Sequence, residues 1–533
     1  MTRWVMVADL QRCVGCQTCT AACKQANATS PMVQWRRVLD IEAGSYPNVS
    51  RTFVPVGCQH CEDPPCMHVC PSTATRRRAD GIVTIDYDLC IGCAYCAVAC
   101  PYQARFKIDA PRFAYGRAAA MQNEILREDP HRIGVAQKCT FCSDRIDFGL
   151  DHGMTPGVDP RATPACVNAC IADALSFGDI DDPNSNVSRL LSSQKHFRMH
   201  EEIGTDPGFY YVYDQEDGEP ASPAVHSVPS PASPVGQIRT KGVEPWHQPS
   251  WDWKAAGNFM FGGTGIGLYT FAAIAAVLGT PPPLPLGPLA TMLVAIGLFL
   301  VLLKIGRPWR FAYVLRQPQR SWMAREAWLA LMFFPLAALA FWFDSRPLLV
   351  AAAIAGLLFL FSQAMMLQGA KGIPAWREPL IVPLIIATGL AEGGGLFVAL
   401  TAPLAPLLFS QIAAAAVMVL VAVRGFAWRA YLDALRVEGA PIRTLQILDA
   451  ARNRLFLFGF VLPIILIAAG FFMTGAAVPL FALGGLCAFF TGWAVKFILV
   501  TRAAYNQGYA LEHTAVHGAW SAGRPIRPGW SVA

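Results

Sequence analysis

Long apolar runs fill the second half of the chain and set it apart from the first half. Each run has about the 20 residues that a helix needs to cross a bilayer. About eight such runs can be counted, near residues 255–279, 287–305, 324–343, 347–367, 379–402, 404–423, 454–474 and 477–500. The pattern predicts an all-α bundle of about eight transmembrane helices.

The first half lacks such runs and alternates short polar and apolar stretches. "GIVTID" at 81–86 is a β-branched run of the kind that forms a strand. "GEPASPAVHSVPSPASPVG" at 218–236 is rich in Pro, Ser and Ala, a composition typical of an extended linker. We therefore expect four regions: an α+β domain, a linker, the helical anchor and a cytoplasmic tail, at residues 1–215, 216–254, 255–503 and 504–533.

Composition agrees with a membrane portion. The 533 residues are 54% hydrophobic and 15% charged, and the mean hydropathy is +0.36. The formal net charge of +6 is too small, without a dense basic stripe, to indicate a nucleic-acid partner.

Sixteen of the seventeen cysteines fall into four tight quartets. The quartets are Cys13, Cys16, Cys19, Cys23; Cys58, Cys61, Cys66, Cys70; Cys90, Cys93, Cys96, Cys100; and Cys139, Cys142, Cys166, Cys170. The first and third have the C-x2-C-x2-C-x3-C spacing of [4Fe–4S] ferredoxins, and Pro101 follows the third. Zinc also binds C-x2-C pairs, and disulfides are a further alternative, but the triple runs and the C-P ending favour [4Fe–4S] clusters.

Residues 1 to about 215 resemble the four-cluster electron-transfer subunit of complex iron–sulfur molybdoenzymes. The motifs "CVGCQTCTAACKQAN", "CQHCEDPPCMHVCP", "CIGCAYCAVACPY", "KCTFCSDRI" and "TPACVNAC" carry the resemblance. The resemblance implies a ferredoxin-like double two-cluster domain without a substrate site. It also implies a separate catalytic subunit that carries molybdenum or tungsten on a pterin.

Spacing and the behaviour of this family together imply that the fourth cysteine of a run binds the neighbouring cluster. We expect four ligand sets: Cys58, Cys61, Cys66 with Cys100; Cys90, Cys93, Cys96 with Cys70; Cys13, Cys16, Cys19 with Cys170; and Cys139, Cys142, Cys166 with Cys23.

The apolar half resembles the eight-helix anchor of the dimethyl sulfoxide reductase and polysulfide reductase type. "IGRPWRFAYVLRQPQRSWMAREA" and "LQGAKGIPAWREP" carry this likeness. Such anchors bind a membrane quinone, ubiquinone or menaquinone, which the resemblance implies here as well. None of the ten histidines lies inside an expected span, so we expect no haem.

Basic residues gather in the loops expected after the second, fourth and sixth runs, whereas only Arg346 lies on the other side. The positive-inside rule then places both termini and the iron–sulfur domain in the cytoplasm, with the anchor in an inner-type membrane in contact with its lipid. The N-terminus shows neither an apolar signal core nor a twin-arginine pair, so we expect no export signal.

Polar residues within or beside the runs are the candidates for a quinone pocket. They are Asn258, Arg325, Glu326, Lys371 and Glu392. A carboxylate such as Glu392 in mid-membrane is costly and marks a functional site by default, although helix association is a rival role. Arg325 and Glu326 are adjacent and are expected to pair. The tryptophans of "EPWHQPSWDW" suit either the headgroup belt or contact with the iron–sulfur domain.

The sequence thus predicts an electron-transfer and quinone-anchor subunit of a molybdenum or tungsten oxidoreductase. A cytoplasmic site favours substrate oxidation with quinone reduction, as in systems similar to sulfite dehydrogenase or phenylacetyl-CoA oxidoreductase. The alternatives are a ferredoxin:quinone oxidoreductase without a molybdenum chain, and a module in which redox energy moves ions.

Overall fold

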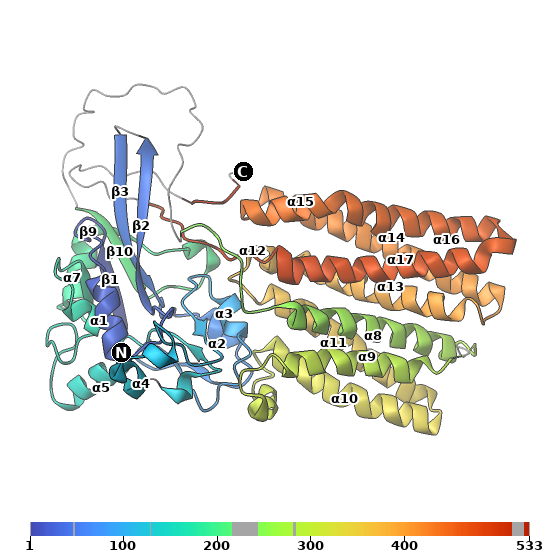
Figure 1. The fold of residues 1–533 in the computed structure, drawn as a ribbon, viewed down its shortest axis with the longest axis horizontal. Coiled ribbons are helices and arrows are strands. Elements are labelled where there is room, and N and C mark those ends of the chain that lie inside the picture. Colours follow the sequence, from blue (N-terminus) through green and yellow to red (C-terminus); the bar gives the residue numbers. More distant parts are fainter. Residues whose placement is uncertain are drawn as a thin grey trace.

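The structure is a computed structural model that describes residues 2–45, 48–127, 129–215, 243–280, 284–513 and 527–531. An N-terminal α+β domain and a bundle of long helices lie end to end (Figure 1). The predicted order, an α+β domain followed by an apolar helical bundle, is confirmed. The expected linker sequence at 218–236 lies outside the described residues.

Short strands in four small sheets build the N-terminal domain. Their bounds are β1 Trp4–Asp9, β2 Arg36–Ser45, β3 Asn48–Gly57, β4 Thr75–Arg77, β5 Val83–Ile85, β6 Phe106–Lys107, β7 Ala136–Gln137, β8 Leu175–Asp179, β9 Gln194–Phe197 and β10 Phe209–Gln215. The largest sheet has the order β8-β1-β10-β9, with β1 parallel to β10 and antiparallel to β8. The strand expected in "GIVTID" is β5, which pairs with β4.

Short helices connect these strands, and two of them are flanked by a cysteine, α3 by Cys100 and α5 by Cys142. They are α1 Thr18–Asn27, α2 Pro65–His68, α3 Tyr95–Ala99, α4 Gln122–Arg127, α5 Ser143–Asp151, α6 Ala165–Asn168 and α7 Asn186–Ser193. Residues just before α1, α3 and α5 (Gln17, Ala94 and Cys142) have left-handed backbone conformations. A left-handed residue at each of these places turns the chain sharply within or next to a cysteine run.

The helical bundle contains the apolar runs in the predicted order. Its helices are α8 Trp253–Val277, α9 Leu286–Leu302, α10 Trp322–Phe343, α11 Arg346–Gln368, α12 Pro374–Arg377, α13 Ile381–Thr401, α14 Leu407–Val437, α15 Ile442–Phe456, α16 Leu462–Phe472 and α17 Ala477–Phe497. Within the described residues, seven helical segments are long and apolar enough to cross a membrane. The eighth run is α9, an apolar helix of 17 residues, which corresponds to about 26 Å.

The sixth and seventh runs extend further than the sequence predicted. Helix α14 continues to Val437, and α15 leads through a π-helical turn at Leu457–Val461 directly into α16. The expected loop after the sixth run is therefore mostly helix, and its first arginine, Arg424, is buried in the bundle. A basic residue at the end of an apolar run was read as a loop residue because sequence shows its charge but not its partners.

Helices α8 and α13 form the buried centre of the bundle, whereas α10 and α16 expose large apolar side chains. Glycine allows the two central helices to touch. A Cβ at Gly267 would lie 2.4 Å from the Gly389 carbonyl oxygen, and one at Gly393 would lie 2.2 Å from the Leu268 nitrogen. The small residues of "GLAEGGGLF" thus have the role that such residues have between membrane helices, a close approach of two backbones.

The loop after α9 docks the bundle onto the N-terminal domain. The backbone nitrogens of Gly306 and Arg307 donate to the carbonyls of Gly92 and Ile91, at 3.3 and 3.1 Å. Arg307 also donates through Nε to the Ile133 carbonyl at 3.0 Å. The basic end of the bundle is therefore the end that faces the α+β domain.

The described part of the segment expected as a cytoplasmic tail contacts both parts of the molecule. Gln507 donates its backbone N–H to Gly372 of the bundle at 3.0 Å, and Tyr509 is 1% exposed against the N-terminal domain. Two of the tryptophans at the start of the bundle differ in their surroundings: Trp251 is buried against Tyr95, and Trp253, the first residue of α8, is 57% exposed. The expected linker region therefore ends in an ordered contact. A place in the headgroup belt stays a prediction.

Gly306→Ala is expected to destabilise this docking by about 1–3 kcal/mol, the usual cost of overpacking. A Cβ at Gly306 would lie 2.0 Å from the Gly134 carbonyl oxygen, a backbone atom that cannot rotate away. The measurement is the unfolding temperature in detergent together with protease sensitivity. Gly475→Ala is the matched control, since a Cβ there meets nothing within 4 Å. Equal behaviour of the two variants would show that the loop does not hold the parts together.

Candidate cofactor groups and membrane pocket

Electrostatic interactions and one shared hollow link cysteines of different sequence quartets, and we divide the sixteen into four groups on the expected crossed sets. We name them group A (Cys13, Cys16, Cys19, Cys170), group B (Cys23, Cys139, Cys142, Cys166), group C (Cys58, Cys61, Cys66, Cys100) and group D (Cys70, Cys90, Cys93, Cys96). Burial and then the neighbouring thiols of the same group raise the pKa of one member of each. These interactions are the ones expected of the crossed ligand sets, which stay a prediction.

The side chains around the groups suit thiolate-bound clusters. Group A encloses a small apolar hollow lined by Val14, Val38 and Leu175 beside its four cysteines. Backbone N–H groups of Ala174 and Thr75 donate to the sulfurs of Cys170 and Cys70, at 3.2 and 3.5 Å. Such N–H···S bonds stabilise thiolates and tune iron–sulfur centres. Within the described residues, no three His, Cys, Asp or Glu side chains form a tight set for a single metal ion.

Burial raises the pKa of Cys19 to about 11 and that of Cys139 to about 12, so these two side chains are neutral thiols without iron. Binding of iron would deprotonate them, because a coordinating thiol is a thiolate. Sets of four cysteines supply the donors that a [4Fe–4S] cluster needs.

The four groups follow one another in a definite order. Thiols of adjacent groups influence one another at three places: Cys19 with Cys166, Cys139 with Cys58, and Cys66 with Cys96. The order is consequently A, B, C, D. Group D lies at the membrane end, since Cys93 reaches the helical bundle.

A narrow pocket lies between group D and the helices. It is lined by Cys93, Trp251, Ala255, Asn258, Phe259, Val301, Lys304, Ile305, Met323, Glu326 and Met366. Its free volume is ≈ 30 Å³, about enough for one water molecule. Met323 and Met366 are flexible side chains of the kind that move aside for a ligand. The pocket is apolar apart from a small set of polar groups, as small-molecule sites usually are.

Two of the five predicted quinone residues meet in this pocket. Asn258 donates through Nδ2 to Glu326 Oε1 at 2.9 Å, and Gln363 donates to the same oxygen at 3.1 Å. Glu326 is 4% exposed. Glu326 is thus a buried carboxylate held by two amides, with no cation bonded to it among the described residues.

The other three candidates lie elsewhere. Arg325 does not pair with Glu326; it donates to the carbonyls of Pro318 and Gln319, both at 2.7 Å. Adjacent residues on a helix point about 100° apart, which explains why this expected pair is wrong. Lys371 does not line the pocket.

Glu392 belongs to a separate cluster of buried charges in the bundle. Its Oε2 accepts from Lys496 Nζ at 2.7 Å and from Thr264 at 3.1 Å. Neither Glu392 nor Lys496 is exposed. Lys496 was missed because it falls near the end of the last apolar run, where a lysine usually reaches out to the interface.

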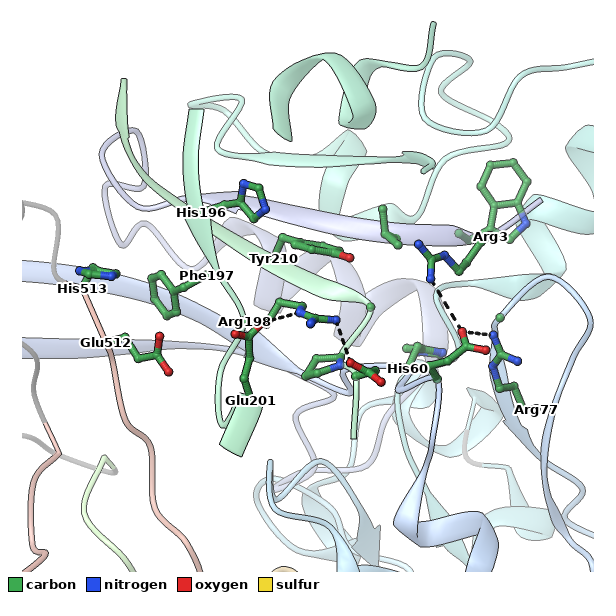
Figure 2. Close-up of a pocket in the computed structure, with 17 residues that line it drawn as sticks. Arg3, His60, Arg77, His196, Phe197, Arg198, Glu201, Tyr210, Glu512 and His513 are labelled. Atoms are coloured by element: carbon green, nitrogen blue, oxygen red, sulfur yellow. Dashed lines mark hydrogen bonds and ion pairs between the residues drawn. The ribbon is translucent and has the colours of Figure 1, made fainter. Parts of the chain in front are cut away.

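A larger polar cleft opens on the N-terminal domain (Figure 2). Its arginines are matched by carboxylates: Arg3 lies 4.0 Å from Glu62, and Arg198 lies 2.5 Å from Glu201. Arg77 also pairs with Glu62. With its charges already compensated, the cleft has no strong preference for an anion or a cation. It lies apart from the pocket beside group D.

Comparison with known proteins identifies the N-terminal region. Residues 49–114 match the model of a 4Fe-4S dicluster domain, so the α+β domain is ferredoxin-like and binds iron–sulfur clusters. A Halobacterium salinarum protein, provisionally named as the iron–sulfur subunit of a dimethyl sulfoxide reductase, is 44% identical over 227 residues, 40% of this chain and 79% of the relative.

Two further relatives have different names. One of the subunits of sulfite dehydrogenase from Allochromatium vinosum is 36% identical, over 40% of this chain and 83% of the relative. The iron–sulfur cluster-binding subunit of menaquinone reductase from Nitratidesulfovibrio vulgaris is 34% identical, over 40% of this chain and 90% of the relative. These matches cover most of each relative and less than half of this chain.

Serine substitutions test the crossed grouping. Cys13→Ser and Cys170→Ser are expected to abolish the same electron paramagnetic resonance signal, and Cys23→Ser and Cys139→Ser a second one, each with a loss of about four irons per chain. Pairing by sequence quartet instead predicts that Cys13→Ser and Cys23→Ser act alike. Cys487→Ser is the control, since that cysteine belongs to no group.

Proposed function

Because the chain belongs to the family of iron–sulfur electron-transfer subunits of molybdoenzyme complexes, we propose that it carries electrons between a separate catalytic subunit and a membrane quinone. Groups A to D would each hold one [4Fe–4S] cluster through their four cysteines. When bound, these clusters supply one-electron transfer along the order of the groups. Substrate catalysis would take place on the other chain, which carries molybdenum or tungsten on a pterin.

One observation carries the quinone part of the proposal: Cys93 of group D lines the same pocket as Asn258 and Glu326. A quinone ring needs a flat apolar slot, a hydrogen-bond partner and a source of protons. Trp251 and Phe259 supply apolar walls, with ring centres 6.1 Å apart. Asn258 and Glu326 supply the polar contacts, so electrons and protons would reach the ring at one place.

Glu326 would hold and release the proton that accompanies each electron. Asn258 and Gln363 fix its Oε1, which leaves the second carboxylate oxygen available to a quinone carbonyl or hydroxyl. Lys304 lines the same pocket and pairs with Asp252 at 3.0 Å. This ion pair would form a charged border of the pocket that water can reach. Ubiquinone and menaquinone both fit this chemistry, and the name of one relative favours menaquinone.

Charge distribution supports a cytoplasmic iron–sulfur domain in an inner-type membrane. Lys304, Arg307 and Arg310 lie at the end of the bundle that meets the domain, and Arg346 begins α11 at the opposite end. The positive-inside rule assigns the basic end to the cytoplasm. A cytoplasmic catalytic site favours substrate oxidation coupled to quinone reduction, as in sulfite dehydrogenase-like or phenylacetyl-CoA oxidoreductase-like systems. The absence of haem stays a prediction.

The direct test is purification of the chain from its native membrane in mild detergent. Iron, molybdenum and tungsten are measured together, and the co-purifying proteins are identified. The proposal expects a large partner with stoichiometric molybdenum or tungsten. Iron without either metal and without a partner would overturn the molybdoenzyme role and favour a ferredoxin:quinone oxidoreductase.

Glu326→Gln is expected to lower the rate of quinone reaction at least tenfold, about 1.4 kcal/mol of activation free energy. The amide keeps the size and the polar contacts but cannot exchange a proton. The measurement is quinol-dependent reduction of the iron–sulfur signals in detergent. Glu438→Gln, an exposed change just after α14, is the control. Unchanged rates in Glu326→Gln with intact iron content would exclude this pocket as the quinone site.

A further inference from the structure

Three cations are buried in the core of the iron–sulfur domain without a carboxylate partner. Arg36 and Lys138 are each 1% exposed and Arg105 is 7% exposed. Among the described residues none of the three forms an ion pair with Asp or Glu; Arg105 donates to Thr75 and Cys66, and Lys138 donates to the Cys139 carbonyl at 2.6 Å. Burying an uncompensated charge is strongly destabilising, so each cation needs a negative partner of another kind.

Arg36 lies where groups A and B meet. Its neighbours are Cys19 of group A and Cys23, Cys139 and Cys166 of group B. Two of its guanidinium nitrogens, Nε and Nη1, are buried and have no hydrogen-bond partner. Donors left unsatisfied in a core indicate a missing acceptor.

Arg105 has the same position between groups C and D. It lies among Cys58, Cys66 and Cys100 of group C and Cys96 of group D. Its Nη2 donates to Cys66 Sγ at 2.9 Å. The guanidinium therefore contributes both charge and a direct N–H···S bond.

Lys138 completes the series between groups B and C. Its charge acts on Cys139 of group B and on Cys66 of group C, where it favours the thiolate. The chain thus places one buried cation at each of the three junctions A–B, B–C and C–D.

We propose that Arg36, Lys138 and Arg105 are positioning charges that raise the reduction potentials of the two clusters flanking each of them. The proposal rests on the proposed function, since it requires clusters in groups A to D. Four thiolates around a [4Fe–4S] core leave a net negative charge that grows by one on reduction, and net charge and hydrogen bonds to sulfur set the potential. A cation held in a low-dielectric core stabilises the reduced form more than the oxidised form.

The placement predicts an overlapping pattern that a merely structural role would not produce. Arg36→Gln should lower the potentials of the clusters in A and B, Lys138→Gln those in B and C, and Arg105→Gln those in C and D. Neighbouring variants share one affected cluster, whereas the Arg36 and Arg105 variants share none. Each shift is expected to be at least tenfold in the reduction equilibrium, about 59 mV for one electron.

The experiment is a redox titration of the full chain, with its partner if one co-purifies, followed by electron paramagnetic resonance. The cysteine-to-serine variants assign each signal to its group, and iron content is measured on the same samples. Arg78→Gln is the matched control, because Arg78 is compensated by Asp80 and Asp147 at 2.8 and 2.6 Å. Arg105→Lys keeps the charge and should shift the potentials by less than half as much as Arg105→Gln.

Lowered potentials in the pairwise pattern, with full iron content, support the inference. Unchanged potentials in iron-replete Gln variants overturn it, as do equal shifts in Arg105→Lys and Arg105→Gln. If one Gln variant loses iron, the variants at the other two junctions still test the inference, since each of them predicts lowered potentials for its own two clusters. Wild-type protein without four cluster signals would instead refute the proposed function on which the inference rests.

Discussion

Burial of charge is the constraint on which the rest of this structure depends. The protein keeps thiols in a dry core and carboxylates inside an apolar bundle, where an ion without a partner is strongly disfavoured. Each of these buried groups has a specific partner in the structure. Cations stand between the cysteine groups, two amides hold Glu326, and Lys496 neutralises Glu392. The fold can be understood as the arrangement that brings these partners together from distant parts of the sequence.

Glu392 and Glu326 are both buried carboxylates of the bundle, but they differ in the residues that bind them. Glu392 is bonded to the amine of Lys496, and the pair joins α13 to α17 in the centre of the bundle. Glu326 is bonded only to neutral amides, at the edge of the bundle next to group D. A carboxylate with neutral partners changes its protonation at a much smaller cost than one locked in an ion pair. The position of Glu326, rather than its residue type, is therefore the reason why we propose it, and not Glu392, as the proton carrier.

Sequence was sufficient where the determining interactions are local. The spacing of three cysteines in a turn is fixed within ten residues, and an apolar run of 20 residues has few alternatives to a helix, so the iron–sulfur motifs and the helices were predictable. Sequence failed where the decisive partner is remote. Nothing near Arg36 or Arg105 shows that each is buried among thiols, and Arg424 looks like a loop residue until α14 is seen to continue past it. The expected ion pair between Arg325 and Glu326 rested on their being adjacent in sequence, and adjacent side chains on a helix point in different directions.

The covalent link between the iron–sulfur domain and the helical bundle affects how the two parts are held together. The relatives match less than half of the chain, so the helical bundle is joined covalently to a domain that alone accounts for most of their length. A covalent link gives the domain a high effective concentration at the bundle, and modest contacts then hold it in place. The contacts seen are of that kind: a glycine loop, a tyrosine hydroxyl of Tyr95 on the Met366 carbonyl at 2.7 Å, and the returning segment around Tyr509. Their value lies in position, since they keep Cys93 at the wall of the membrane pocket that Asn258 and Glu326 also line.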